Sequence, residues 1–148
     1  MVKKNSMLRL FGVVLTALLT ACSQLPSSVP GLSEASLSRL ETRVAERWQA
    51  RIAHDWGAEW EYNSPAFREV FPKQLYVKKF SYTGNWELTG LEVIEYDPEA
   101  AVASVVVRVM SRPTKQTSAA ARAIGAMQRE LHEKWILVDG EWWFSAGQ

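Results

Sequence analysis

Apolar residues recur every three or four positions over residues 37–52, and at about 100° per residue they fall within about 120° of one another. This spacing predicts a long amphipathic helix, for which Ser33 or Ser36 would be the N-cap. The apolar face of the predicted helix consists of Leu37, Leu40, Val44, Trp48 and Ile52.

Shorter helices are expected over residues 56–80. Asp55 is suited to cap a helix through residues 56–62, and Ser64-Pro65 is a start signal for another over 66–71, because proline is tolerated at the first helical position. Pro72 is suited to begin a fourth helix that runs to Phe80.

Alternating and β-branched residues predict strands after Gly84. Residues 88–96 and 102–110 read as one hairpin, and residues 130–138 and 141–145 as a second across Asp139-Gly140, a strong type I′ turn signal. Residues 115–128 between the hairpins fit either a loop or a short helix. The second hairpin pairs Val138 with Glu141, which gives a core face with Trp135, Leu137, Trp142 and Phe144 and a mixed face with His132, Lys134, Ile136, Glu141 and Trp143.

Helices followed by an antiparallel sheet indicate an α+β fold. The segments HDWGAEWEYNSPAFR (54–68) and EKWILVDGEWWF (133–144), with the long first helix, resemble the nuclear transport factor 2-like superfamily, which includes ketosteroid isomerase and SnoaL-like cyclases. The resemblance implies a cone in which N-terminal helices pack on a curved antiparallel sheet over residues 34–148.

The first 21 residues predict an export signal. Basic residues precede an apolar run at 10–21 that is too short for a membrane-spanning helix, which needs about 20 residues. Leu19-Thr20-Ala21-Cys22 resembles the lipobox of bacterial lipoproteins, which implies lipidation of Cys22, and Ser23 after it implies the outer membrane, facing the periplasm. An ordinary cleaved signal with an incidental thiol is the alternative. Residues 23–33, rich in serine and proline, are then expected to form a flexible tether.

Charge and composition exclude several function classes. The formal net charge is +1, and it falls to about −2 without the first 21 residues, whereas nucleic-acid binders usually carry a basic excess. Two histidines and one cysteine do not form a metal-ligand motif, and no cofactor is predicted. His54 and Asp55 are the nearest candidates for catalysis, but adjacent side chains diverge on a helix, and Asp55 is more simply a cap.

Aromatic and basic residues supply three candidate surfaces. The seven tryptophans suggest either a large core or an apolar pocket in the cone, with Trp48, Trp60, Tyr62 and Trp135 as its wall. A row of arginines along the first helix suggests either an anion or partner contact or a solvated face: Arg39, Arg43, Arg47 and Arg51. Ile136 and Trp143 suggest a dimer or partner face, or else a surface covered by the chain's own loops.

The sequence therefore predicts a membrane-anchored envelope lipoprotein whose cone domain, without catalysis, binds a hydrophobic small molecule or an envelope protein partner. An isomerase, dehydratase or cyclase that uses the cone pocket is the alternative. A carboxylate or histidine that faces the pocket would favour the enzyme.

Overall fold

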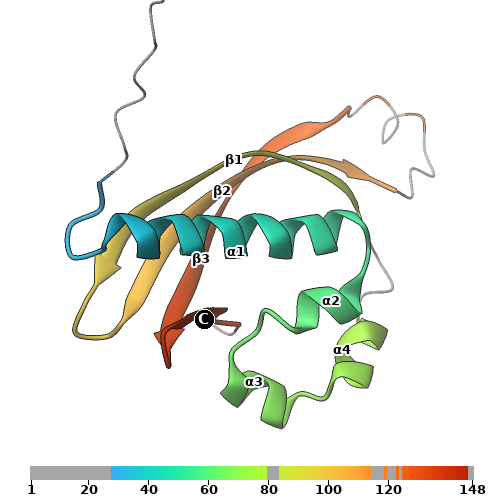
Figure 1. Cartoon of the computed structure of the whole chain (residues 1–148). Coiled ribbons are helices and arrows are strands. Elements are labelled where there is room, and N and C mark those ends of the chain that lie inside the picture. Colours follow the sequence, from blue (N-terminus) through green and yellow to red (C-terminus); the bar gives the residue numbers. More distant parts are fainter. Residues whose placement is uncertain (1–27, 80–83, 115–118, 120–122, 124, 147–148) are drawn as a thin grey trace, which may run out of the picture.

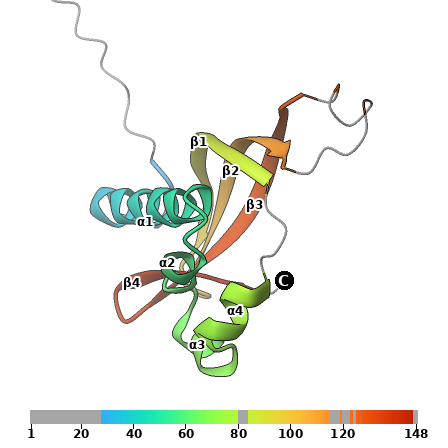
Figure 2. The same cartoon turned by 90° about the vertical axis from the view of Figure 1, so that its right-hand side faces the viewer.

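The computed structural model describes residues 28–79, 84–114, 119, 123 and 125–146. Within these residues, helices precede and pack against a four-stranded antiparallel sheet in the order β1-β2-β3-β4, which confirms the predicted α+β class. In Figure 1 the sheet curves over α1, and Figure 2 shows α2, α3 and α4 gathered near β4. The elements are α1 (Glu34–Ile52), α2 (Trp56–Trp60), α3 (Pro65–Val70), α4 (Lys73–Lys79), β1 (Gly84–Asp97), β2 (Val102–Pro113), β3 (Met127–Val138) and β4 (Glu141–Phe144).

Polar caps fix where the helices begin. The Ser33 side chain accepts a hydrogen bond from the Ser36 amide at 3.2 Å and starts α1. Asp55 Oδ1 accepts from the Ala58 amide at 2.8 Å, and Ser64 Oγ accepts from the Phe67 amide at 3.3 Å with proline as the first residue of α3. The caps predicted from the sequence are thus confirmed, and the helix ends differ from prediction by one or two residues.

The sheet is longer than the alternation pattern predicts. β1 begins at Gly84 and contains two register shifts, between Leu88 and Gly90 and between Val93 and Glu95, and such bulges bend a strand. At the tip of the β1-β2 hairpin, Asp97 Oδ1 accepts hydrogen bonds from the amides of Glu99 and Ala100 at 2.9 and 3.1 Å. β3 already begins at Met127, inside a segment for which the sequence left loop and helix open.

The second hairpin forms in the predicted register. Trp135 pairs with Phe144 and Leu137 with Trp142, and Asp139 (φ 52°) and Gly140 (φ 78°) have the positive φ angles of a type I′ turn. Trp135 and Trp142 are 0% and 1% exposed. They join a core that consists of the apolar face of α1 and the inward valines of β2: Leu37, Leu40, Val44, Trp48, Val105, Val107 and Val109.

The prediction of a flexible tether over residues 23–33 is wrong for residues 28–33. Val29 is 7% exposed and belongs to the core cluster, Leu32 packs against that cluster, and Gly31 (φ 82°) lies against the Tyr96 ring. Val29 is the side chain that anchors this segment, since full burial of a valine stabilises by about 1.5–3 kcal/mol, and the partly buried Leu32 adds a smaller contribution. Among the described residues, the folded domain therefore includes Val29.

Residues 1–27, with the apolar run and Cys22, lie outside the described residues. None of the helices described from residue 28 onward is long and apolar enough to cross a membrane.

Candidate ligand cavity

A cavity of about 470 Å³ lies between the inner face of the sheet and the ends of the helices. Its volume falls within the range of about 300–1,000 Å³ that is usual for small-molecule sites. One part of its wall is aromatic and apolar, and the other part carries charged groups. The residues that line it are Arg47, Arg51, Asn63, Phe67, Tyr76, Lys79, Leu131, His132, Glu133, Phe144 and Ala146.

The charged part of the wall rests on a buried cluster around Arg47, which is 2% exposed. Arg47 Nη1 donates to Glu133 Oε1 at 2.8 Å, and Nη2 donates to Glu59 Oε1 at 2.9 Å. The same Glu59 oxygen lies 3.0 Å from Arg51 Nε. The Arg47 guanidinium also stacks on Phe144, with Cζ 3.6 Å from the ring centroid. We call Arg47, Arg51, Glu59 and Glu133 the buried ion cluster; its formal charges cancel.

Two tryptophans fix the carboxylate of Glu133. Trp48 Nε1 donates to Oε1 and Trp135 Nε1 donates to Oε2, each at 3.0 Å. Both indoles are fully buried, and an indole N–H in the core needs an acceptor. Glu133 therefore serves the indoles and Arg47 together, and its position is determined by side chains from two elements, α1 and β3.

Some polar atoms of this layer have no hydrogen-bond partner among the described residues. They are Arg47 Nε, Glu59 Oε2 and Asn63 Oδ1, and Glu59 and Asn63 are 0% exposed. Buried polar groups in native proteins are nearly always satisfied by protein, water or ligand. Two of the three residues line the cavity, but the unpartnered atoms themselves are buried, so they mark incomplete hydrogen bonding inside the layer and are not groups open to a ligand.

Tyr76 closes the side of the cavity formed by α4 and is 5% exposed. Burial raises the pKa of its phenol above 10.0, and the Glu59 carboxylate adds to the rise, whereas Arg47, the Asn63 side chain and Arg51 oppose it. The Tyr76 hydroxyl is therefore a neutral hydrogen-bonding group at the edge of the charged wall over the physiological pH range.

The four residues predicted as pocket wall do not line this cavity. Trp48 and Trp135 are core residues, Trp60 Nε1 donates to the Phe71 carbonyl at 2.9 Å, and Tyr62 packs beside Arg43. Each of these tryptophans finds a polar partner inside the fold and is held away from the cavity. The aromatic wall consists instead of Phe67, Tyr76 and Phe144.

The row of four arginines divides between solvent, surface and cavity. Arg39 is exposed, Arg43 is half-buried, and Arg47 and Arg51 line the cavity. A step of four residues on a helix advances about 400°, so each arginine lies about 40° further round than the one before. The row therefore rotates from the solvent face of α1 into its apolar stripe, and it forms neither one solvated face nor one outward ridge.

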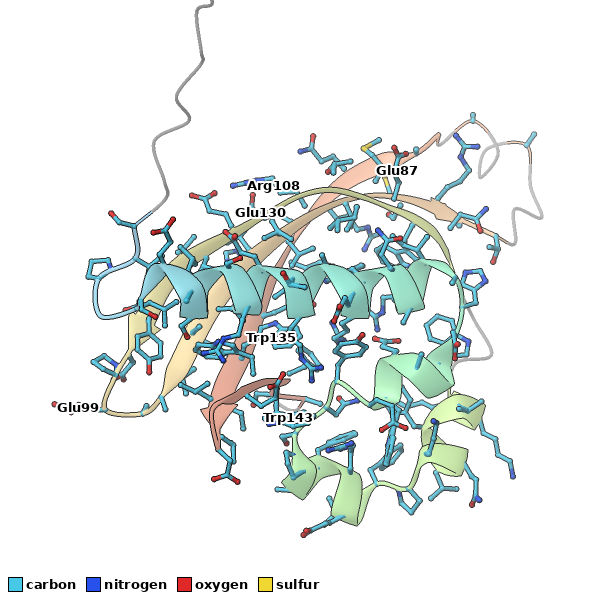
Figure 3. The ribbon with its side chains drawn as sticks, in the orientation of Figure 1. Glu87, Glu99, Arg108, Glu130, Trp135 and Trp143 are labelled. Atoms are coloured by element: carbon cyan, nitrogen blue, oxygen red, sulfur yellow. The ribbon has the colours of Figure 1, made fainter. Side chains whose placement is uncertain are left out.

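Trp143 lies in an alternating stack of cationic and aromatic side chains, which we call the outer ladder: Tyr62, Arg43, Trp143, Arg68, Trp60 and Lys73. The successive cation-to-ring distances are 4.7, 5.1, 4.8, 5.5 and 5.8 Å. Glu141 lies 3.3 Å from Arg43, and Glu61 contacts both Arg68 and Lys73, at 3.1 and 2.8 Å. Figure 3 shows Trp135 on β3 just below α1, and Trp143 beside β4, above α3.

The outer ladder covers Trp143 with the chain's own arginines rather than with a loop. Ile136, its cross-strand partner, is half-buried and borders a hollow with Ser104, Lys134 and Glu95. His54, exposed and at φ 57°, stacks on Trp56 at 5.5 Å, and Asp55 caps α2, so neither approaches the cavity.

No protein-family model matches the sequence, and no curated protein matches it. Solved structures similar to this chain include a SEC-C motif containing protein from Rhodopseudomonas palustris (16% identity, 73% of this chain and 76% of that chain, TM-score 0.48). Another is Aln2 from a Streptomyces species (12% identity, 79% of this chain and 89% of that chain, TM-score 0.47). At these scores neither likeness bears on function.

Proposed function

We propose that this chain is a lipid-anchored envelope protein whose domain binds a small ligand in the cavity beside Arg47, without catalysis. The carrying observation is a cavity of about 470 Å³ that has an aromatic wall and a charged wall fixed by the buried ion cluster. A pocket with an apolar body and a few fixed polar groups is the usual form of a small-ligand site. As the resemblance to the nuclear transport factor 2-like superfamily implies, the pocket lies between the helices and the sheet.

The test of ligand binding is to close the cavity without disturbing the cluster. Leu131 lies on the cavity side of β3, and Leu131→Trp would fill the space. Glu130→Trp is the matched control, because Glu130 is the preceding residue and is 52% exposed. Native mass spectrometry of protein extracted gently from its own membrane should find a bound small molecule in the wild type and in Glu130→Trp, and none in Leu131→Trp. Equal occupancy in all three proteins would refute the cavity as the site.

The anchor rests on the lipobox-like sequence that ends at Cys22. Two or more acyl chains hold a protein to a membrane, at about 0.8 kcal/mol per buried CH₂. Radiolabelled palmitate should enter the wild type and not Cys22→Ala. Label in the cysteine variant would refute lipidation at this residue.

An isomerase-, dehydratase- or cyclase-like enzyme remains the second candidate, because a carboxylate and a histidine, Glu133 and His132, line the cavity. A general base needs a free acceptor within reach of the substrate. Glu133 already accepts from Arg47, Trp48 and Trp135, and the His132 side chain is 69% exposed with Nε2 3.6 Å from Glu130 Oε1, so the arrangement favours binding. A protein partner at Ile136 and Trp143 has weaker support, because Arg43 and Arg68 already cover the indole. Sedimentation of the domain tests for a homodimer.

A further inference from the structure

The charges around the cavity do not balance. The buried ion cluster is neutral as a whole, since Arg47 and Arg51 are matched by Glu59 and Glu133. Lys79 on α4 also lines the cavity, and no acidic residue other than Glu133 does so among the described residues. Among the described residues, the cavity wall therefore carries more positive than negative charge, which favours an anionic group in the cavity.

Donors also outnumber free acceptors along the charged wall. Glu133 is engaged through both oxygens and is 7% exposed, whereas Arg51, whose side chain is 22% exposed, and Lys79 line the cavity as cations. Lys79 brings an ammonium with up to three donors, which lies 6.0 Å from the centroid of the Phe71 ring. An anionic oxygen would satisfy these donors, and charge-assisted hydrogen bonds are about twice as strong as neutral ones.

The apolar part of the cavity wall determines the chemistry of the rest of the ligand. Phe67, Leu131 and Phe144 form its apolar part, and the ring of Phe144 is already in contact with Arg47 on the charged side. A ligand that spans both parts needs an apolar body directly joined to its anionic head.

We infer that the cavity binds an amphipathic anion, with a carboxylate or similar head at Lys79 and the arginines and an apolar body over Phe67, Leu131 and Phe144. This inference rests on the proposed function, because it names the ligand class of the same cavity. The anionic head distinguishes the ligand from neutral and cationic analogues, and the apolar body contributes most of the surface area that is buried on binding.

The test compares three probes with one alkyl chain: decanoate, decan-1-ol and decylammonium. Titration calorimetry of the full lipidated protein in detergent should show decanoate binding about tenfold more tightly than the alcohol, and the ammonium most weakly. Lys79→Gln should remove most of the preference for decanoate and leave decan-1-ol unchanged. Lys78→Gln is the matched control, since it removes the same charge from the adjacent exposed residue, which does not line the cavity.

The outcomes separate the two proposals. If decan-1-ol binds as tightly as decanoate and Leu131→Trp abolishes both, the anion inference is overturned and the ligand cavity stands. If Lys78→Gln weakens decanoate as much as Lys79→Gln, the preference comes from general surface charge and the inference is likewise overturned. If none of the probes binds, and no membrane-derived ligand is found, both proposals fail.

Discussion

The buried ion cluster and the outer ladder contain the same residue types but differ in how far their ion pairs are exposed to water. In the cluster, Arg47 is 2% exposed and its partners Glu59 and Glu133 are 0% and 7% exposed. In the ladder, Arg43 and Arg68 are 23% and 24% exposed, and their partners Glu141 and Glu61 are each 49% exposed. Of the four arginines in the two arrangements, Arg47 alone is shielded from water, whereas Arg43, Arg68 and the cluster member Arg51, 22% exposed, are still in contact with it.

The difference in burial decides what each arrangement contributes. A buried charge left without its partner costs several kcal/mol, so Arg47, Glu59 and Glu133 depend on one another. An exposed pair is screened and contributes about 0–1 kcal/mol, so the ladder stabilises mainly through ring contacts. The cluster therefore keeps the cavity wall in one geometry, and the ladder fastens β4 to the helices through many small contributions.

The largest effect is expected from Arg47→Met. Removal of the guanidinium leaves the carboxylates of Glu59 and Glu133 buried without their main partner, and the free energy of unfolding should fall by about 3–5 kcal/mol. Urea denaturation measures the loss. Arg39→Met, at the exposed end of the same row, should stay within about 0.5 kcal/mol. The triple variant with Glu59→Gln and Glu133→Gln should recover part of the loss; a single-variant loss below about 1 kcal/mol would contradict the assignment.

Trp143→Leu tests the outer ladder. Leucine keeps an apolar side chain but loses the ring that faces Arg43 and Arg68, and we expect a loss of about 1–2 kcal/mol. A double-mutant cycle with Arg68→Met should give a coupling energy of about 0.5–1 kcal/mol. If the losses in unfolding free energy of the two single variants simply add, the stacking of Arg68 on Trp143 contributes no measurable stability.

Tyr76→Phe probes the cluster from its aromatic side at alkaline pH. Because burial raises the pKa of Tyr76 above 10.0 in the folded state, the unfolded chain releases this proton first as the pH rises. The contribution of this group is thus complete below about pH 10 and declines above it, by up to about 1.4 kcal/mol per pH unit. Urea titrations between about pH 8 and 11 should show a steeper decline in the wild type than in Tyr76→Phe. If the free energy of unfolding declines with pH in the same way in both proteins, the decline comes from the ionisation of another group.

The smallest effect is expected at the end of the ladder. The hydrogen bond from Lys73 lowers the pKa of Glu61 below 4.5, so this contribution is present above pH 4.5 and is lost as the pH falls through the folded-state pKa. Lys73→Gln should cost less than about 1 kcal/mol at about pH 7, and the gap from wild type should close in acid. In NMR titrations the Glu61 carboxyl of the variant should have a higher pKa. If the pKa of Glu61 is the same in Lys73→Gln as in the wild type, the hydrogen bond from Lys73 does not lower it.

Local chemistry predicted the elements well, because caps, turns and alternation act over a few residues. Ser33, Asp55 and Ser64 cap helices as expected, and Asp139-Gly140 sets the hairpin register. The α+β class followed from the order of the elements. The burial of Val29 was not predicted, because a single valine between polar residues has no periodicity.

The candidate cavity was predicted less well, because its residues come together from distant elements. Glu133 is two residues before Trp135 on one strand, and that spacing alone puts its carboxylate on the core face. The drift of the arginine row into the apolar stripe of α1 is likewise readable from the sequence, at about 40° per step. In contrast, no local pattern joins Tyr76, Lys79 and Asn63 to β3, since only the tertiary packing of the short helices brings them to one wall.

The burial of Val29 has a consequence for where the protein works. With the proposed lipid at Cys22, the chain between anchor and domain comprises residues 23–28, which reach at most about 20 Å when extended. A domain on so short a connection diffuses with the membrane and stays in a thin layer above it. Its local concentration near the lipid surface is then set by this geometry, as in any tethered pair of binding partners. If the proposed anchor and the proposed ligand are both correct, a site of modest affinity is sufficient, because the tether holds the domain in the layer into which the membrane releases its molecules.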